Sequence, residues 1–185
     1  ANIRTGFLPG VECMSIYLIR HPQPAIEPDI CYGRSDIPLA GPVEPLLQPL
    51  RALLPADYRL ASSPLQRCAQ LARALHPQPQ FDPRLQELDF GCWELQRWTT
   101  LGAATLDNWI ASDFGDQIHG GESAAAFQQR IFHWCREQVD QTQPLVVVTH
   151  AGVIRAILAR IHGWPLLQAM NHPLDYASVT CIAEK

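Results

Sequence analysis

The sequence predicts a three-layer α/β/α fold, with a mostly parallel central sheet and helices on both of its faces. Two unbroken apolar runs carry this prediction, one at Ile16–Ile19 and one at Leu145–Val148. A strand without polar alternation is typical of a parallel sheet, in which helices cover both faces. Segments with apolar residues at helical spacing follow these runs and supply the covering layers.

Length and composition indicate one domain. A chain of 185 residues with 47% hydrophobic residues can bury one sizeable core. Residues 1–13 show no usable periodicity and precede Met14, which resembles a natural start. We therefore expect an N-terminal extension at 1–13 and a single domain at 14–185.

The charge and cysteine patterns exclude several function classes. A formal net charge of -4 provides no basic footprint, so neither nucleic acid nor an anionic membrane is expected as a partner. The six cysteines are dispersed and none stands at zinc-ligand spacing, so we expect no metal and no cofactor. No apolar run of about 18 residues and no signal-peptide pattern is visible, which predicts a cytoplasmic location.

The first strand ends on Arg20 and His21, directly before Pro22. Proline disfavours a helix at this point and keeps His21 in extended backbone. His21 should therefore lie at the carboxyl end of a central strand, where open α/β sheets bind ligands. A histidine there can also simply hydrogen-bond a loop, so the interpretation depends on whether other strands end in the same way.

A long loop and a helix follow the first strand. Residues 22–45 are rich in Pro, Gly and Asp, and include the segment Tyr32–Leu39. Long loops in compact domains are usually functional. Leucines then recur at helical spacing up to Pro55, at positions Leu46, Leu47, Leu50, Leu53 and Leu54.

The second strand of interest runs from Tyr58 into Ser63. We expect Ser63 to cap a helix and Pro64 to occupy its first position, which places Arg67 in the first turn. Helix N-termini attract anions, and an arginine adds a bidentate fork that suits phosphate. The buried face of this helix would comprise Leu65, Cys68, Leu71, Ala72 and Leu75.

The third segment ends on His150, after which Gly152 permits a tight turn into an apolar helix. The carboxyl ends of these strands would bring together Arg20, His21, Arg67 and His150. A cup of arginines and histidines is typical of phosphoryl transfer, because guanidinium forks match the oxygens of the transferring group. One imidazole can attack phosphorus and carry it covalently.

Such a reaction also needs an acid for the leaving oxygen. Glu87, Asp89 and Glu94 lie beside aromatic residues, and an apolar setting raises the pKa of a carboxyl group. Their spacing does not choose among the three.

The remaining segments fit the same fold. Residues 108–117 would form part of a lid, and His119 is expected at the surface rather than against substrate. Ser123 or Glu122 should lie near the cap of a helix, and Tyr176–Ala183 should form an antiparallel edge strand. Trp98 and Trp109 could stack an aromatic base, although core packing is more common for tryptophan.

Six blocks of this chain together resemble the histidine phosphatase superfamily, which has the phosphoglycerate mutase-like fold. They are Arg20-His21, Tyr32–Leu39, Ser62–Arg67, Glu87–Glu94, Gly120–Ser123 and Val148–Val153, within a match from about Ser15 to Cys181. The resemblance implies that His21 is the phosphorylated nucleophile and Glu87 the proton donor. It further implies a phosphate pocket of Arg20, Arg67 and His150, substrate contacts from Gly33 and Arg34, and a small phosphomonoester as substrate. The protein would be a monomer or homodimer.

Departures from the family pattern affect the loops. Pro22 and Pro24 stand where the family usually has Gly and Thr, and Leu95 stands where it often has Gly. The short separation of Glu87 and Gly120 is similar to phosphatases rather than mutases. Within the superfamily the blocks look most like alpha-ribazole phosphatases of cobalamin synthesis. The alternatives are a broad-specificity phosphatase, a small mutase-like enzyme, or a phosphate-binding regulatory module without turnover.

Overall fold

The computed structural model of the chain describes residues 15–112, 114–115, 118–138 and 143–182. The expected extension at 1–13 lies outside this range. Among the helices of these described residues, none combines the length and the apolar composition of a membrane span.

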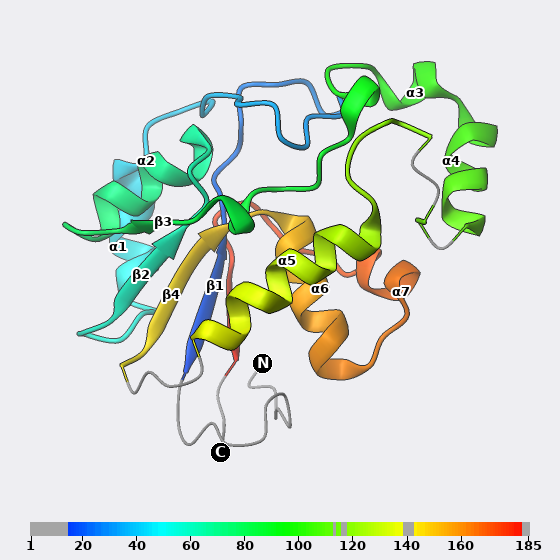
Figure 1. Ribbon diagram of the computed structural model, residues 1–185. Helices are drawn as coiled ribbons and strands as arrows, with labels where there is room; N and C mark the ends of the chain where they lie inside the picture. The colour runs from blue at the N-terminus through cyan, green and yellow to red at the C-terminus, as the bar shows by residue number, and fades with distance from the viewer. Residues whose placement is uncertain (1–14, 113, 116–117, 139–142, 183–185) are drawn as a thin grey trace.

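The central sheet has five strands in the order β3-β2-β4-β1-β5, and Figure 1 shows it at the left of the molecule. Its strands are β1 (Ile16–Arg20), β2 (Arg59–Ser62), β3 (Gln80–Phe81), β4 (Leu145–Thr149) and β5 (Val179–Ile182). The pairs β1–β4, β2–β4 and β2–β3 are parallel, whereas β5 pairs antiparallel with β1. The mostly parallel sheet and an antiparallel edge strand are both confirmed, although this strand begins at Val179 rather than at Tyr176.

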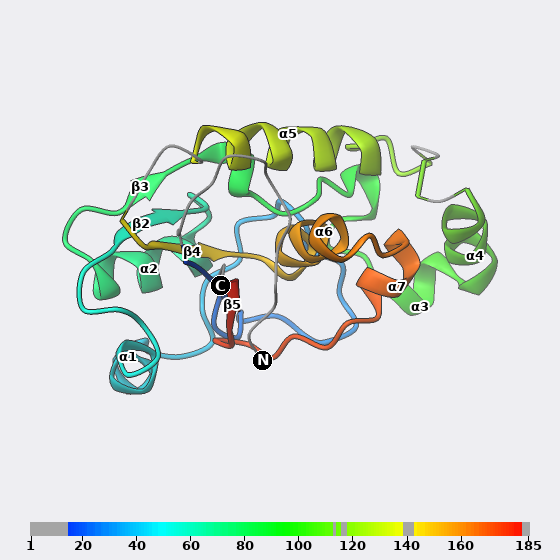
Figure 2. The same ribbon diagram turned by 90° about the horizontal axis from the view of Figure 1, so that it is seen from below.

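Helices cover both faces of this sheet (Figure 2). One face packs against α1 (Glu44–Arg51) and α2 (Gln66–Leu75), and the other against α5 (Ala124–Glu137) and α6 (Ala151–His162). Side chains alternate between the faces of β4, since Val146 and Val148 belong to the first core and Leu145 and Val147 to the second. The three-layer prediction is therefore confirmed.

The shorter elements lie along the connections between strands. They are the 3-10 turns η1 (Pro83–Leu85) and η2 (Gly91–Trp93), and the helices α3 (Trp98–Leu101), α4 (Ala103–Ala111) and α7 (Leu166–Met170). Figure 1 shows α3 and α4 at the end of the molecule away from β3. Aromatic rings from these shorter elements and the loops beside them pack edge to face. They include Phe90, Trp93, Trp98, Trp109 and Phe114.

The beginning of α2 differs from the prediction. Its N-cap is Leu65 in extended backbone, not Ser63. The Ser63 hydroxyl instead lies 2.8 Å from His150 Nε2, and Asp36 Oδ1 accepts from the Gln66 backbone N–H at 2.7 Å. A carboxylate from a distant loop thus does the capping, while Arg67 still falls in the first turn as predicted.

Two further expectations were wrong. The first helix ends at Arg51 rather than just before Pro55, and Leu53 beyond it is 61% exposed. His119 is buried, not at the surface, because it packs against the rings of Phe90, Trp93 and Trp109. The cap prediction for α5 was right for Ser123, whose hydroxyl accepts from the Ala126 N–H.

Candidate active site

His21 occupies the carboxyl end of β1 and is only 2% exposed. Its backbone N–H donates to the Thr149 carbonyl, which fixes it beside the end of β4. Burial lowers the pKa of His21 to about 3, and the charges of Arg67 and Arg20 act in the same direction. The imidazole is therefore neutral at neutral pH.

The neutral ring of His21 has a defined tautomer. Its Nδ1 lies 2.7 Å from the Pro22 carbonyl oxygen, which can only accept a hydrogen bond. Nδ1 must therefore carry the proton, and Nε2 keeps a free lone pair. This is the form of imidazole that can act as a nucleophile.

His150 lies next to His21, with 5.2 Å between the ring centroids. It stands at the N-cap of α6, is fully buried, and contacts the Ser63 hydroxyl. Burial holds the pKa of His150 well below its usual value, with a further contribution from Arg67. His150 is thus a neutral group at the same strand-end site.

Two arginines flank the histidine pair. Arg67 is fully buried and donates to the Ser35 and Gly33 carbonyls, both at 2.7 Å. Arg20 donates to the Leu174 carbonyl, and its guanidinium lies 3.8 Å from the centre of the Tyr176 ring. Among the described residues the Nε atoms of Arg20 and Arg67 are buried without a hydrogen-bond partner. Arg20 also lines the site cavity, whereas Arg67 and His150 are not among the described residues that line it.

Glu87 is held at the start of α6. Its Oε2 accepts from the Gly152 N–H at 2.9 Å, and its Oε1 from the Leu88 N–H at 3.0 Å. A Cβ on Gly152 would lie 2.1 Å from Glu87 Oε1, so only glycine allows the carboxylate to sit there. Glu87 and His21 line the same cavity.

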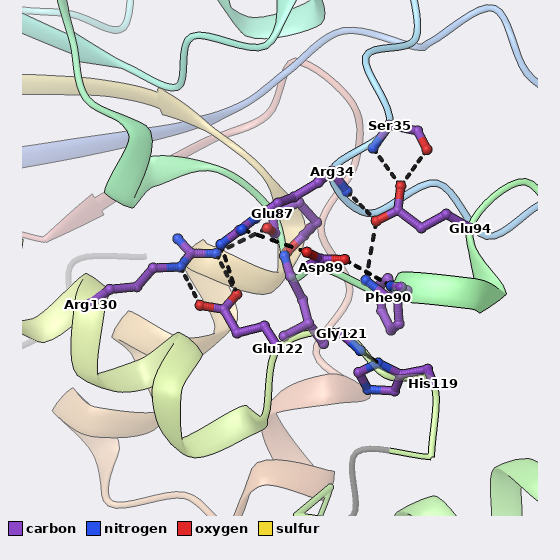
Figure 3. Close-up of polar contacts among 12 residues, drawn as sticks. Arg34, Ser35, Glu87, Asp89, Phe90, Glu94, His119, Gly121, Glu122 and Arg130 are labelled. Carbon is purple, nitrogen blue, oxygen red and sulfur yellow. Dashed lines mark hydrogen bonds and ion pairs between the residues drawn. The ribbon is translucent and has the colours of Figure 1, made fainter.

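The other carboxylates of this segment are engaged elsewhere (Figure 3). Glu94 accepts from the backbone N–H groups of Arg34, Ser35 and Phe90 at 2.7, 2.5 and 3.1 Å. Asp89 accepts from the Gly91 N–H and lies 3.7 Å from the Arg34 guanidinium. Neither carboxylate is among the described residues that line the cavity.

The predicted loop residues separate in space. Gly33 is buried and borders the cavity, whereas the Arg34 guanidinium points to Glu122 at 3.2 Å and to Asp89 at 3.7 Å. Glu122 also holds Arg130, which donates to the Glu87 backbone carbonyl at 3.0 Å (Figure 3). This ion-pair chain links the loop to the backbone that carries Glu87.

The cavity has a volume of about 330 Å³. Its polar side chains are those of Arg20, His21, Glu87, Gln128 and Arg155, together with the two tyrosines Tyr32 and Tyr176. The rest of the wall is largely apolar, with Phe90, Trp98, Trp109, Phe114, Phe127, Leu166 and Met170. Trp98 and Trp109 therefore belong both to the aromatic packing and to the cavity wall.

Sequence reasoning missed several members of this site. Tyr32 and Tyr176 meet at 3.2 Å between their hydroxyl oxygens, and Tyr176 covers Arg20. The sequence around Tyr176 does not indicate a site, because the alternation of residues Tyr176–Ala183 predicts only a strand. Arg155 could have been found, since it lies one helical turn after Ala151 and so shares its face.

The fold and this site agree with comparisons to known proteins. A family model of the histidine phosphatase superfamily (branch 1) matches residues 16–185. This chain belongs to that superfamily. As a histidine phosphatase, it is a hydrolase of phosphomonoesters, and the resemblance inferred from the six blocks is confirmed.

Two curated proteins are similar to this histidine phosphatase over most of its length. The adenosylcobalamin/alpha-ribazole phosphatase of Escherichia coli is 30% identical and covers 86% of this chain and 84% of its own. A Hydrogenobacter thermophilus protein that is named as a phosphoserine phosphatase is 28% identical to this chain. The match covers 89% of this chain and 87% of that protein.

Solved structures give the same fold. The alpha-ribazole phosphatase of Shigella flexneri superposes with a TM-score of 0.76 at 25% identity, over 92% of this chain and 94% of that one. A phosphoglycerate mutase from Thermus thermophilus superposes with a TM-score of 0.71 at 28% sequence identity. The superposition covers 91% of this chain and 92% of that one. The phosphoglycerate mutase-like fold is therefore confirmed for this histidine phosphatase.

Proposed function

We propose that this histidine phosphatase hydrolyses alpha-ribazole 5'-phosphate without a metal ion, through a phosphohistidine at His21. The observation that carries the proposal is the cavity, which places His21 and Glu87 beside aromatic walls within one space of about 330 Å³. The relatives named as alpha-ribazole phosphatases support the choice of substrate.

In the first step, His21 Nε2 attacks the phosphorus of the ester. The P–N bond forms as the P–O bond to the alcohol breaks, and Glu87 delivers its proton to the departing oxygen. Arg20 and Arg67 hold the equatorial oxygens, whose charge is spread in the transition state. In the second step, water attacks the phosphorus, and the new P–O bond forms as the P–N bond breaks and returns its electron pair to His21 Nε2. Glu87 takes up a proton from the attacking water, and inorganic phosphate leaves.

The leaving alcohol would lie against the aromatic wall. Alpha-ribazole carries an aromatic base, and the faces of Trp98 and Trp109 suit such a ring. Its ribose hydroxyls would find hydrogen-bonding groups in Gln128 and Arg155, which line the same cavity.

A second candidate substrate is phosphoserine. Arg155 favours it, since this cation in the cavity wall could pair with the carboxylate of the substrate. Arg155 donates to the His172 carbonyl through Nε and Nη2 only, so Nη1 has no hydrogen-bond partner among the described residues. The largely apolar wall does not match the small charged leaving group, and phosphoserine therefore takes second place.

The test is a turnover assay in excess chelator with alpha-ribazole 5'-phosphate, phosphoserine, 3-phosphoglycerate and para-nitrophenyl phosphate. We expect release of inorganic phosphate, with the highest kcat/KM for alpha-ribazole 5'-phosphate. A higher value for phosphoserine, lost in Arg155→Ala, would transfer the assignment to phosphoserine. Phosphate binding without turnover of any ester would show a regulatory module instead.

A further inference from the structure

The position of the Arg67 guanidinium depends on the loop at Gly33–Ser35. Its Nη2 donates to the Gly33 carbonyl and its Nη1 to the Ser35 carbonyl, both at 2.7 Å. These bonds use two of the five N–H groups of the arginine and fix the plane of the fork. Any shift of the two carbonyls would therefore move the remaining donors, which include the unpartnered Nε.

Glu94 holds the opposite side of the same loop (Figure 3). Its Oε1 accepts from the Arg34 N–H at 2.7 Å, and its Oε2 from the Ser35 N–H at 2.5 Å and from the Ser35 hydroxyl. The Gly33 carbonyl and the Arg34 N–H belong to one peptide group. That single trans peptide thus accepts from the Arg67 cation on one side and donates to the Glu94 anion on the other.

This arrangement leaves the loop little freedom. A Cβ on Gly33 would lie 2.0 Å from the Leu88 carbonyl oxygen and 2.9 Å from Glu94 Oε1, so the loop is in close contact with the Leu88–Glu94 segment. Hydrogen bonds in a chain polarise one another, and a charge at each end strengthens the peptide bonds between them. The loop therefore connects the carboxylate and the guanidinium rigidly.

We propose that Glu94 is a positioning residue for phosphoryl transfer, which orients the Arg67 guanidinium through the Gly33–Arg34 peptide. The inference rests on the proposed function only in giving Arg67 a phosphate oxygen to bind. Glu94 does not exchange a proton with substrate, because it is not among the described residues that line the cavity, whereas Glu87 is. Its effect should therefore reach the reaction only by way of Arg67.

A double-mutant cycle tests this coupling. Arg67→Ala should lower kcat by about 100-fold, the usual loss for one preorganised donor. Glu94→Gln places an NH₂ donor against backbone N–H groups, and should lower kcat by about 10-fold for alkyl and aryl phosphates alike. In the double variant Glu94→Gln should add less than about 2-fold to the loss from Arg67→Ala, because residues acting through one contact are not additive.

The matched control is Asp89→Asn, which removes a carboxylate from the same segment without touching the Gly33–Ser35 backbone. Its effect on kcat should be small and should combine multiplicatively with Arg67→Ala. Ser35→Ala removes only the hydroxyl bond to Glu94 and should give a smaller loss of kcat in the same direction. This milder variant tests the same coupling if Glu94→Gln folds poorly.

Binding of vanadate, which mimics the transition state, and of inorganic phosphate gives a readout that does not need turnover. Glu94→Gln should weaken vanadate more than phosphate, whereas general loosening would weaken both equally. Multiplicative losses for Glu94→Gln and Arg67→Ala, or an unchanged preference for vanadate, would overturn the inference. A wild-type chain without turnover but with the vanadate preference lost in Glu94→Gln would overturn the proposed function and support the positioning role.

Discussion

At the scale of single residues, Pro22 has a direct effect on the chemistry of His21. The family usually has glycine at this position, and proline was expected to disturb the substrate loop. Proline lacks the backbone N–H but has a carbonyl like any other residue, and this carbonyl fixes the proton on Nδ1 of His21. Burial, which lowers the pKa of His21 to about 3, keeps the other nitrogen free to attack.

The nucleophile can be identified by trapping. Wild-type protein quenched during turnover should carry phosphate that is labile in acid and stable in base, as expected of a phosphoramidate. His21→Ala should lose both the label and turnover, while far-UV circular dichroism shows the fold retained. Label found on Ser63 or on a cysteine would contradict the assignment.

The acid can be identified by its dependence on the leaving group. Protonation matters greatly for a poor alkoxide and little for a stabilised phenolate. Glu87→Gln should therefore lower kcat for an alkyl phosphate by at least about 100-fold and spare most activity on para-nitrophenyl phosphate. Asp89→Asn should show no such selectivity, and selectivity there instead of at Glu87 would move the role to Asp89.

Gly152→Ala provides an independent test of the same acid without touching Glu87. The added methyl carbon would lie 2.1 Å from Glu87 Oε1 and must displace it. The variant should reproduce the leaving-group dependence of Glu87→Gln. Gly41→Ala, where nothing lies within 4 Å of the new carbon, should behave as wild type.

At the scale of elements, the sequence located strands better than helix ends. Unbroken apolar runs identify β1 and β4 because such runs need both faces buried. The start of α2 could not be predicted, because its N-terminus is capped by Asp36 from a distant loop and the Ser63 hydroxyl is used by His150. His119 was misjudged for the same reason, since its aromatic neighbours come together only in the folded chain.

The turn after η2 contains a strained residue. Leu95, which stands where relatives often have glycine, has φ of 65° and is 60% exposed. A residue with a side chain costs about 1–2 kcal/mol in the left-handed region. An exposed leucine offsets little of this cost, because its side chain is not buried. Leu95→Gly should raise the free energy of unfolding by about 1 kcal/mol in urea titrations.

Leu53→Gly is the control for this prediction. Leu53 is equally exposed but is not among the described residues with positive φ. Glycine there should lower stability by about 0.5–1 kcal/mol through the entropy of the unfolded chain. A loss of stability in both variants would show that the Leu95 backbone is not strained.

At the scale of the whole molecule, parallel topology explains why much of the site could be predicted. Strands that run in one direction bring their carboxyl ends to one edge, and so His21, Arg67 and His150 converge. The aromatic wall and Tyr176 could not be placed, because they belong to connections whose packing depends on side chains from several segments. The chemical roles of the converged residues remain predictions.

The buried histidines should make the fold sensitive to acid. The pKa values of His21, His119 and His150 are all lowered, chiefly by burial. Below pH 6.5, the ordinary pKa of histidine, these histidines bind protons in the unfolded chain but stay neutral in the folded chain. The free energy of unfolding therefore falls as pH falls. For His21, whose folded pKa is about 3, this effect removes up to about 1.4 kcal/mol of stability per pH unit below pH 6.5.

Urea titrations between pH 7 and pH 5 measure this effect, with His21→Gln as the comparison. The variant lacks the contribution of His21 to the pH dependence, so its free energy of unfolding should decline less steeply towards pH 5. The same slope for both proteins would mean that His21 is protonated in the folded state.

The pairing of β1 with β4 has a consequence for synthesis of the chain on the ribosome. Ile16 pairs with Leu145, and Arg20 with Thr149, so the first strand finds its parallel neighbour only after most of the polypeptide has emerged. Until then an apolar strand has unpaired edges, which is the condition under which nascent chains associate with chaperones or with each other. The phosphatase site therefore cannot be complete before β4 has emerged, and a ribosome-bound chain that stops short of β4 holds His21 without His150.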